Sequence, residues 1–263
     1  MSDAGVKRIP RENRIRYRWI ILAILICSEM AHPAVAESPT REFWPEIDVW
    51  LRVSSDWRFS MFVPLSRNIE TAYREGNLIL QADYAFGHAK RPFLTRMLDE
   101  NRSQSMKTWL ARGGYLGAKS LNDKGDAYRE YMAFGELHLR TPIKGRWLVS
   151  HRLRPELRWI GDEHEFSTRF RYRFMVEKEL QAGPFSFVPY ANVEPYYDSR
   201  YSTFNRVRLI GGTSVAWSPR YALECNFTYQ HDSRSSVTNL YALGIILHLF
   251  FEAPGRRREA GAN

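Results

Sequence analysis

Apolar and polar side chains alternate along most of this chain, from about residue 46 nearly to its end. The clearest example runs from Phe166 to Val176, where mainly aromatic residues hold one parity and arginines hold most of the other. Residues two apart share a face of a β-strand, whereas a helix would mix the two sets. Each alternating segment is therefore predicted to be a strand with one apolar and one polar face.

The pattern recurs often enough to count strands. The alternating segments are 47–53, 57–63, 78–86, 109–117, 131–141, 147–159, 166–176, 187–196, 204–217, 221–229 and 237–251. Single-chain bacterial barrels have an even number of strands. We therefore expect about twelve strands, with the twelfth hidden between residues 68 and 76, and ten as the alternative.

The connections between these segments differ in length. Short turns are expected at 144–145, 182–183 and 218–219, and longer polar loops at 91–106, 121–128, 198–202 and 231–236. In an up-and-down barrel of the outer membrane, the short turns face the periplasm and the long loops face outside. The segment 91–100 could also form a short helix.

Aromatic residues favour a membrane barrel over a soluble sandwich. Those near the ends of the predicted strands are Trp44, Trp50, Trp57, Trp109, Trp147, Trp159, Trp217, Tyr190, Tyr196, Tyr197 and Tyr201. Such positions suit the two aromatic girdles of a transmembrane barrel, whereas a sandwich would bury its aromatics in a core. We predict an all-β fold, an antiparallel up-and-down transmembrane β-barrel over residues 37–251.

Both ends of the sequence carry targeting features. Basic residues precede a short apolar run from Trp19 to Cys27, and the small-x-small triplet 34–36 follows, which predicts a signal peptide at 1–36 with cleavage before Glu37. An uncleaved anchor helix is the alternative, and lipidation at Cys27 is less favoured because Ile26 precedes it. The last strand ends on Phe251 like a signal for the barrel-assembly machinery, although a polar tail, 252–263, follows.

The formal net charge of +9 does not indicate a nucleic-acid-binding protein. The basic residues are spread over strand-like segments instead of being gathered on one tail or helix face. Export would also separate the protein from nucleic acid. The expected location is the outer membrane of a Gram-negative bacterium, and the expected partners are outer-membrane lipid, the barrel-assembly machinery and small anionic solutes.

Several motifs together resemble a known bacterial family. They are Asp48–Leu51 with Trp57, Gly113–Tyr115, Arg152–Arg158, Arg169–Arg173, Val188–Glu194 and Asn205–Arg206. This combination resembles the family catalogued as domain of unknown function 2490, whose members are regarded as outer-membrane barrels. The resemblance implies a barrel of the outer membrane, and it implies no reaction.

The polar parity predicts an interior wall of charged residues. The residues expected to line the lumen are Glu136, Arg152, Arg154, Glu156, Arg158, Arg169, Arg171, Arg173, Glu194, Arg206 and Arg208, with Glu177 and Glu224 as further carboxylates. Such a wall could be a ladder of ion pairs that fills a narrow barrel. It could also be a basic, porin-like constriction that favours anions. The barrel is thus expected to act as a structural scaffold or as a small anion-preferring channel.

An enzyme is the less favoured alternative. An outer-membrane lipid hydrolase needs a serine activated by a histidine. Ser150 and His138 share the inward parity on neighbouring strands, whereas His151 has the outward parity, and His248 is a further candidate base. None of them lies in a recognisable motif. The histidines are also scattered, so we predict no metal site and no cofactor.

Overall fold

The structure is a computed structural model, and it describes residues 39–88, 107–122, 128–182, 185–216, 218–235 and 238–253. The predicted signal peptide, its cleavage site before Glu37, the possible helix at 91–100 and residues 254–263 of the tail lie outside the described residues. No helix among the described residues is long and apolar enough to cross a membrane.

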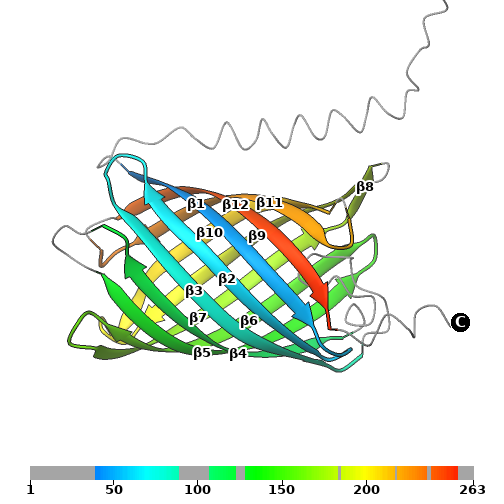
Figure 1. The fold of residues 1–263 in the computed structure, drawn as a ribbon, viewed down its shortest axis with the longest axis horizontal. Helices are drawn as coiled ribbons and strands as arrows, with labels where there is room; N and C mark the ends of the chain where they lie inside the picture. Colours follow the sequence, from blue (N-terminus) through cyan, green and yellow to red (C-terminus); the bar gives the residue numbers. More distant parts are fainter. Residues whose placement is uncertain are drawn as a thin grey trace, which may run out of the picture. The chain divides into compact units, whose positions relative to one another are not determined.

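The described part of the chain is built from β-strands (Figure 1). The strands are β1 (Thr40–Arg52), β2 (Trp57–Asn68), β3 (Arg74–Phe86), β4 (Trp109–Ser120), β5 (Arg129–Ile143), β6 (Trp147–Ile160), β7 (Glu165–Lys178), β8 (Leu180–Ala182), β9 (Phe185–Asp198), β10 (Thr203–Ala216), β11 (Tyr221–Asp232) and β12 (Asn239–Glu252). Each of the predicted segments corresponds to one long strand. The remaining strand is the three-residue β8, whereas the region 68–76 forms the hairpin between β2 and β3.

The sheet closes on itself, which confirms the predicted all-β barrel. Strands β1 to β7 and β9 to β12 form the closed wall, and β8 pairs only with β9, at the rim of the barrel in Figure 1. Every neighbouring pair is antiparallel except β1 and β12, which run parallel from Thr40 opposite Leu240 to Arg52 opposite Glu252. Eleven wall strands make this unavoidable, because the first and last strands of an odd, alternating series point the same way. The even number expected for the wall was therefore wrong.

We call the end of the barrel that contains Arg52 and Glu252 the C-terminal rim, and the end that contains Thr40 the N-terminal rim. The C-terminal rim carries the connections 53–56, 87–108, 144–146, 179–184 and 217–220. The N-terminal rim carries 69–73, 121–128, 161–164, 199–202 and 233–238. The three predicted short turns share the C-terminal rim and three of the four predicted long loops share the N-terminal rim, but the connection that contains the fourth, 91–106, lies with the turns. The predicted separation of long loops from short turns therefore holds only in part.

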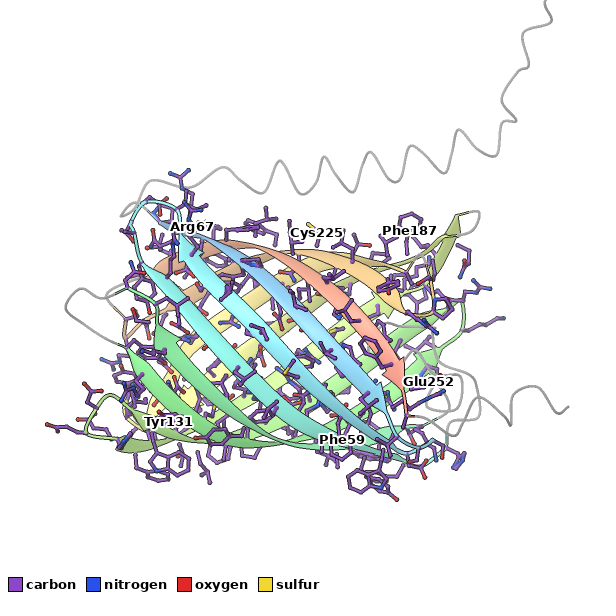
Figure 2. The ribbon with its side chains drawn as sticks, viewed as in Figure 1. Phe59, Arg67, Tyr131, Phe187, Cys225 and Glu252 are labelled. Carbon is purple, nitrogen blue, oxygen red and sulfur yellow. The ribbon has the colours of Figure 1, made fainter. Side chains whose placement is uncertain are left out.

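The two faces of the wall have opposite chemistry, as the alternation predicted. Leu153 and Phe170 point outward and keep 55% and 54% of their surface exposed, whereas the inward Asp83 and Glu156 keep 0% and 1%. Figure 2 shows outward side chains along the whole wall, including Phe59 and Tyr131. The barrel therefore has an apolar exterior and a charged interior.

The aromatic residues expected to form girdles lie on the outer face of the wall only in part. At the C-terminal rim Trp57, Tyr84, Phe86 and Trp109 follow one another in ring contact, with centroids 4.9 to 6.3 Å apart. Trp50 and Tyr196, however, are buried inside the barrel with 2% and 1% of their surface exposed.

Two other predicted girdle residues also belong to the interior. Trp44 lies beneath the inward Arg208, and Tyr190 donates a hydrogen bond to Glu224. Even-numbered positions of β1 and β9 face inward, so position near a strand end does not decide the side on which a ring lies. Trp217 lies outside the described residues.

Candidate functional site

The interior wall contains all of the residues predicted to line the lumen. The structure places on inward faces Glu136, Arg152, Arg154, Glu156, Arg158, Arg169, Arg171, Arg173, Glu194, Arg206 and Arg208. They come from β5, β6, β7, β9 and β10, which are neighbours around the wall. Most of them join in a continuous network.

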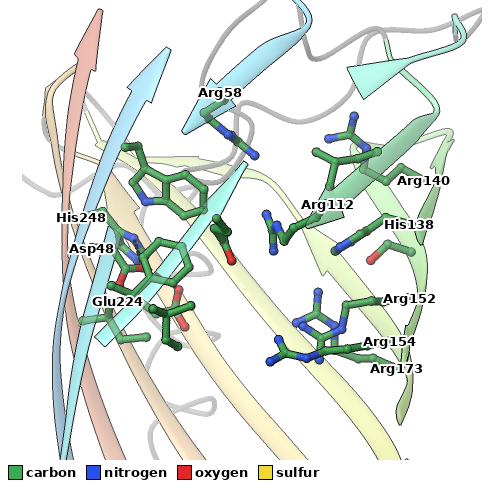
Figure 3. A pocket seen from close by; sticks show the side chains of 17 residues that line it. Asp48, Arg58, Arg112, His138, Arg140, Arg152, Arg154, Arg173, Glu224 and His248 are labelled. Atoms are coloured by element: carbon green, nitrogen blue, oxygen red, sulfur yellow. Dashed lines mark ion pairs between the residues drawn. The ribbon is translucent and has the colours of Figure 1, made fainter. Parts of the chain in front are cut away.

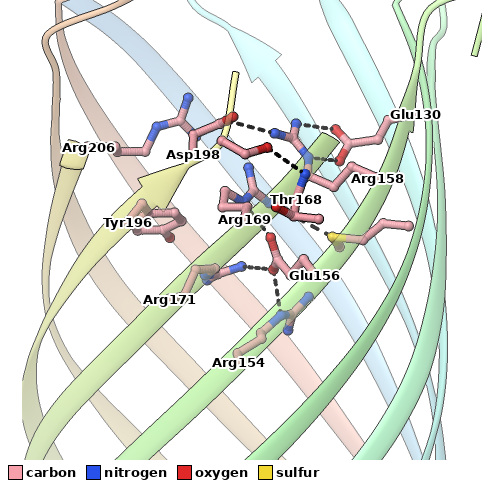
Figure 4. A network of polar contacts seen from close by, with 12 residues as sticks. Glu130, Arg154, Glu156, Arg158, Thr168, Arg169, Arg171, Tyr196, Asp198 and Arg206 are labelled. Atoms are coloured by element: carbon pink, nitrogen blue, oxygen red, sulfur yellow. Dashed lines mark hydrogen bonds and ion pairs between the residues drawn. The ribbon is translucent and has the colours of Figure 1, made fainter. Parts of the chain in front are cut away.

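Glu156 is a centre of this network (Figure 4). Its carboxylate accepts hydrogen bonds from Arg154 Nε at 2.6 Å, from Arg171 Nη1 at 3.0 Å and from Arg169. One carboxylate thus serves three guanidinium groups from two adjacent strands. Charge-assisted hydrogen bonds of this kind are the strong ones in proteins.

Two further carboxylates extend the network around the wall. Glu136 lies 2.8 Å from Arg154 Nη1 and 3.3 Å from Arg152 Nη1. Glu194 accepts from Arg171 Nη2 at 2.9 Å and also from Arg152. Arg152 therefore links β5 to β9 across β6 and β7, which are the strands between them.

The network continues into strands that the sequence analysis did not include. Arg112 Nη1 lies 3.0 Å from Glu136, its Nε lies 2.6 Å from Asp83, and Asp83 also pairs with Arg58 Nη2 at 2.6 Å. We call the whole set the ion-pair belt: Arg58, Asp83, Arg112, Glu136, Arg152, Arg154, Glu156, Arg169, Arg171 and Glu194. Six arginines face four carboxylates, so the belt carries an excess of positive charge.

The three belt residues that the sequence analysis did not include could have been recognised from the sequence. Arg58 and Arg112 lie in segments already predicted as strands, at positions opposite in parity to the exposed aromatic residues beside them. Asp83 follows the same rule in β3. Applying the inward parity to every strand, and not only to the arginine-rich ones, would have found all three.

A glycine lets the aromatic ring beneath one of these arginines lie flat against the wall. Arg154 Cζ lies 3.9 Å from the centre of the Phe134 ring. A Cβ atom at Gly114, on the neighbouring strand, would lie 2.3 Å from Phe134 Cζ and 2.9 Å from the Leu80 carbonyl oxygen. Only glycine leaves room for this stacked arrangement.

The N-terminal half of the lumen holds separate pairs. Arg158 lies 2.6 Å from Glu130 and 3.0 Å from Asp198, which also pairs with Arg200. The predicted residues Arg206 and Arg208 contact Asp232 and Gln230 instead of a belt carboxylate.

Tyr196 lies at the meeting point of the belt and these pairs. Its ring centre is 4.6 Å from Arg171 Cζ and 5.5 to 5.6 Å from the corresponding atoms of Arg169, Arg206 and Arg208. Arginine over an aromatic face is a favourable electrostatic arrangement. The buried tyrosine therefore helps to hold four like charges near one another.

The C-terminal half of the lumen contains a cavity of about 200 Å³ (Figure 3). Its arginines are Arg58, Arg112, Arg140, Arg152, Arg154 and Arg173. Across from most of them lie Asp48, Glu224 and His248, from β1, β11 and β12. His248 Nδ1 is 3.1 Å from Asp48 and its Nε2 is 3.4 Å from Glu224. We call this cavity the arginine cavity.

The serine and histidine of the enzyme alternative also line the arginine cavity. Ser150 lies opposite Arg140 in the β5 to β6 register, and His138 lies opposite Arg152, so the two are offset by two positions. His138 Nε2 is 2.7 Å from Glu136 Oε2. The outward His151 contacts the Tyr172 hydroxyl instead, at 2.7 Å. Neither histidine is seen bonded to Ser150.

Metal binding has no support from the described ranges. Within them, no three histidine, cysteine, aspartate or glutamate side chains lie where they could together hold a metal ion.

Comparison with known proteins gives one finding. The family model described as "Protein of unknown function (DUF2490)" matches residues 41–241, which cover the wall from β1 into β12. No curated protein matches the chain. The matched range includes every residue of the ion-pair belt and most of the arginine cavity. The chain therefore belongs to the DUF2490 family of proteins of unknown function.

Proposed function

We propose that this protein is a β-barrel of the bacterial outer membrane, that the ion-pair belt holds its interior together, and that the arginine cavity admits small anions. The exposed apolar face of the wall supports the membrane location. In water, side chains such as Leu153 and Phe170 would remain in contact with solvent. In a bilayer, lipid would cover them, while the charged residues would stay inside.

Strand length agrees with this location. The wall strands contain 12 to 15 residues. A tilted strand needs about 9–11 residues to cross the hydrocarbon core of a bilayer. The basic segment and apolar run at the start of the sequence support export, and outer-membrane lipid and the barrel-assembly machinery would then be partners.

The excess of arginines around the arginine cavity is the observation that carries the anion preference. Six arginines line it, against the two carboxylates Asp48 and Glu224. Rings of arginine or lysine in a pore favour anions because they stabilise negative charge at the constriction. Four of the six, Arg58, Arg112, Arg152 and Arg154, are held in place by the belt, so this part of the positive surface is fixed before any solute arrives.

Ion selectivity in planar bilayers tests this function. The chain from Glu37 onward, refolded and inserted, should give an anion-selective current in a potassium chloride gradient. R173Q, which alters the cavity wall, should shift the reversal potential toward zero. R220Q, in an exposed turn, should leave it unchanged. A silent bilayer or a cation-selective current would contradict the proposal.

Lipid hydrolysis has weaker support. Ser150 and His138 both face the interior, away from the apolar exterior on which lipid would lie. The test is lipid hydrolysis by the purified protein. If the protein hydrolyses lipid and S150A does not, an enzyme replaces the proposed function.

A further inference from the structure

The two sides of the arginine cavity carry opposite charge (Figure 3). The arginines come from β2, β4, β5, β6 and β7, and the acidic side comes from β1 and β11. His248 lies between Asp48 and Glu224, within 3.4 Å of both. Even when His248 carries a proton, two carboxylates outnumber one imidazolium. The acidic side therefore keeps a net negative charge while facing the arginines.

Buried polar atoms without hydrogen-bond partners gather around this cavity. They belong to residues that line it and are more than nine-tenths buried: Asp48 Oδ1, Trp50 Nε1, Gln81 Nε2 and Arg152 Nε. Buried polar groups in native proteins almost always have a partner, either protein, water or ligand. Such a concentration around one cavity, with donors on both sides and a carboxylate oxygen on the acidic side, points to a polar occupant.

The chemistry of the two sides restricts that occupant. A guanidinium group binds a carboxylate or a phosphate through two parallel hydrogen bonds. The acidic side suits an ammonium group, because its two carboxylates can pair with a positive charge. The Trp50 ring beside it contacts Arg58, whose Cζ lies 4.5 Å from the ring centre. A simple anion would leave the net negative charge of the acidic side unbalanced, and a simple cation would face six arginines.

Size gives a second restriction. A volume of about 200 Å³ is small beside the cavities of roughly 300–1,000 Å³ that hold drug-sized ligands. Only a compact molecule fits.

We propose that the arginine cavity binds a small zwitterion, with its anionic group toward the arginines and its ammonium group toward Asp48 and Glu224. An amino acid with a short carbon chain has this chemistry and this size. The inference rests on the proposed anion-admitting lumen and specifies the ligand class of the same site.

Calorimetric titration of the refolded chain in detergent micelles tests the ligand class. The zwitterionic probes are glycine, β-alanine and γ-aminobutyrate, which differ in the spacing of their charges. The matched anions are acetate, propionate and butyrate, and methylammonium is the matched cation. At least one zwitterion should bind about tenfold more tightly than its matched anion and than methylammonium.

Variants test which side of the cavity binds the ammonium group and which binds the anionic group. In D48N the affinity for the zwitterion should exceed the affinity for the matched anion by less than about threefold, compared with about tenfold in the unchanged protein. E224Q gives a second reading of the acidic side in case D48N does not fold. R173Q should weaken zwitterion and anion alike, and E163Q, in an exposed turn, should change neither.

The outcomes separate this inference from the proposed function. Equal affinity for zwitterion and matched anion, or a preference that survives both D48N and E224Q, would overturn the zwitterion. So would the absence of binding by every probe, which would indicate a cavity that holds water only. An anion-selective current measured beside any of these results would leave the proposed function standing. Zwitterion binding by a barrel that gives no current would overturn only the passage of anions.

Discussion

Removal of the Glu156 carboxylate should destabilise the barrel more than any single arginine loss in the ion-pair belt. Glu156 keeps 1% of its surface exposed and accepts from Arg154, Arg169 and Arg171. In E156Q the three guanidinium groups lose their shared counter-charge, and the excess of positive charge in the belt rises from two to three. Breaking a buried ion pair by removing one partner costs about 3–5 kcal/mol. We expect the free energy of unfolding of E156Q to be lower than that of the unchanged protein by this amount.

An arginine variant provides the internal comparison. R169Q leaves Glu156 with Arg154 and Arg171, so no buried charge loses all of its partners. The expected loss is that of one hydrogen bond to a charged group, about 1.5–3 kcal/mol. E163Q, in the exposed turn between β6 and β7, should change stability by less than about 0.5 kcal/mol.

Equilibrium unfolding in urea measures these differences. The refolded chain in phospholipid vesicles can be followed by tryptophan fluorescence and by the migration of the folded band in electrophoresis without heating. The expected order of destabilisation is E156Q, then R169Q, then E163Q. If E156Q is as stable as E163Q, or if R169Q costs more than E156Q, then water compensates the belt charges and the belt does not hold the interior together.

Three further changes test other parts of the structure. G114A should cost about 1–3 kcal/mol of stability in the same urea assay, because a methyl group there meets an aromatic ring, while G113A, where a Cβ meets no atom within 4 Å, should be nearly neutral. L153R should cost about 2–4 kcal/mol in vesicles if the outward face meets lipid at mid-depth, and a loss below about 1 kcal/mol would argue against that location. The hydrogen bond from Lys107 lowers the pKa of Asp56 in the turn 53–56 from its ordinary value of 3.8. The pair therefore stabilises the fold fully above pH 3.8, and this stabilisation is lost as the pH falls through the lowered pKa of Asp56. The stability difference between wild type and K107Q should therefore shrink in acid, and a difference that is constant with pH would contradict this assignment.

The strands could be predicted from the sequence because alternation is a local property. The arginines between Phe166 and Val176 fix an inward face for that segment without any knowledge of its neighbours, and the structure confirms it. Pairing partners and direction are not local. Nothing in the residues of β1 states that it lies beside β12 in a parallel register. The parallel closure of the wall therefore could not be predicted.

The candidate site was predictable to a similar extent. Inward parity identified Glu156 and Arg171 as lumen residues, yet parity alone does not reveal which charges meet. Arg152 reaches Glu194, which lies two strands away, because the curvature of a closed wall brings long side chains together across an intervening strand. On the acidic side of the arginine cavity, Glu224 was predicted as a lumen carboxylate, but Asp48 and its contact with His248 were missed for the same reason. Asp48 and His248 come from opposite ends of the chain and meet only where the wall closes.

The parallel pairing of β1 and β12 has a consequence for how the barrel could enter a bilayer. A hairpin crosses a membrane twice and leaves both of its ends on the side from which it came. In a bilayer, a wall of eleven strands would leave Thr40 and Glu252 on opposite sides. One strand would therefore cross without a hairpin partner, and one end of the wall would have to be carried through the lipid.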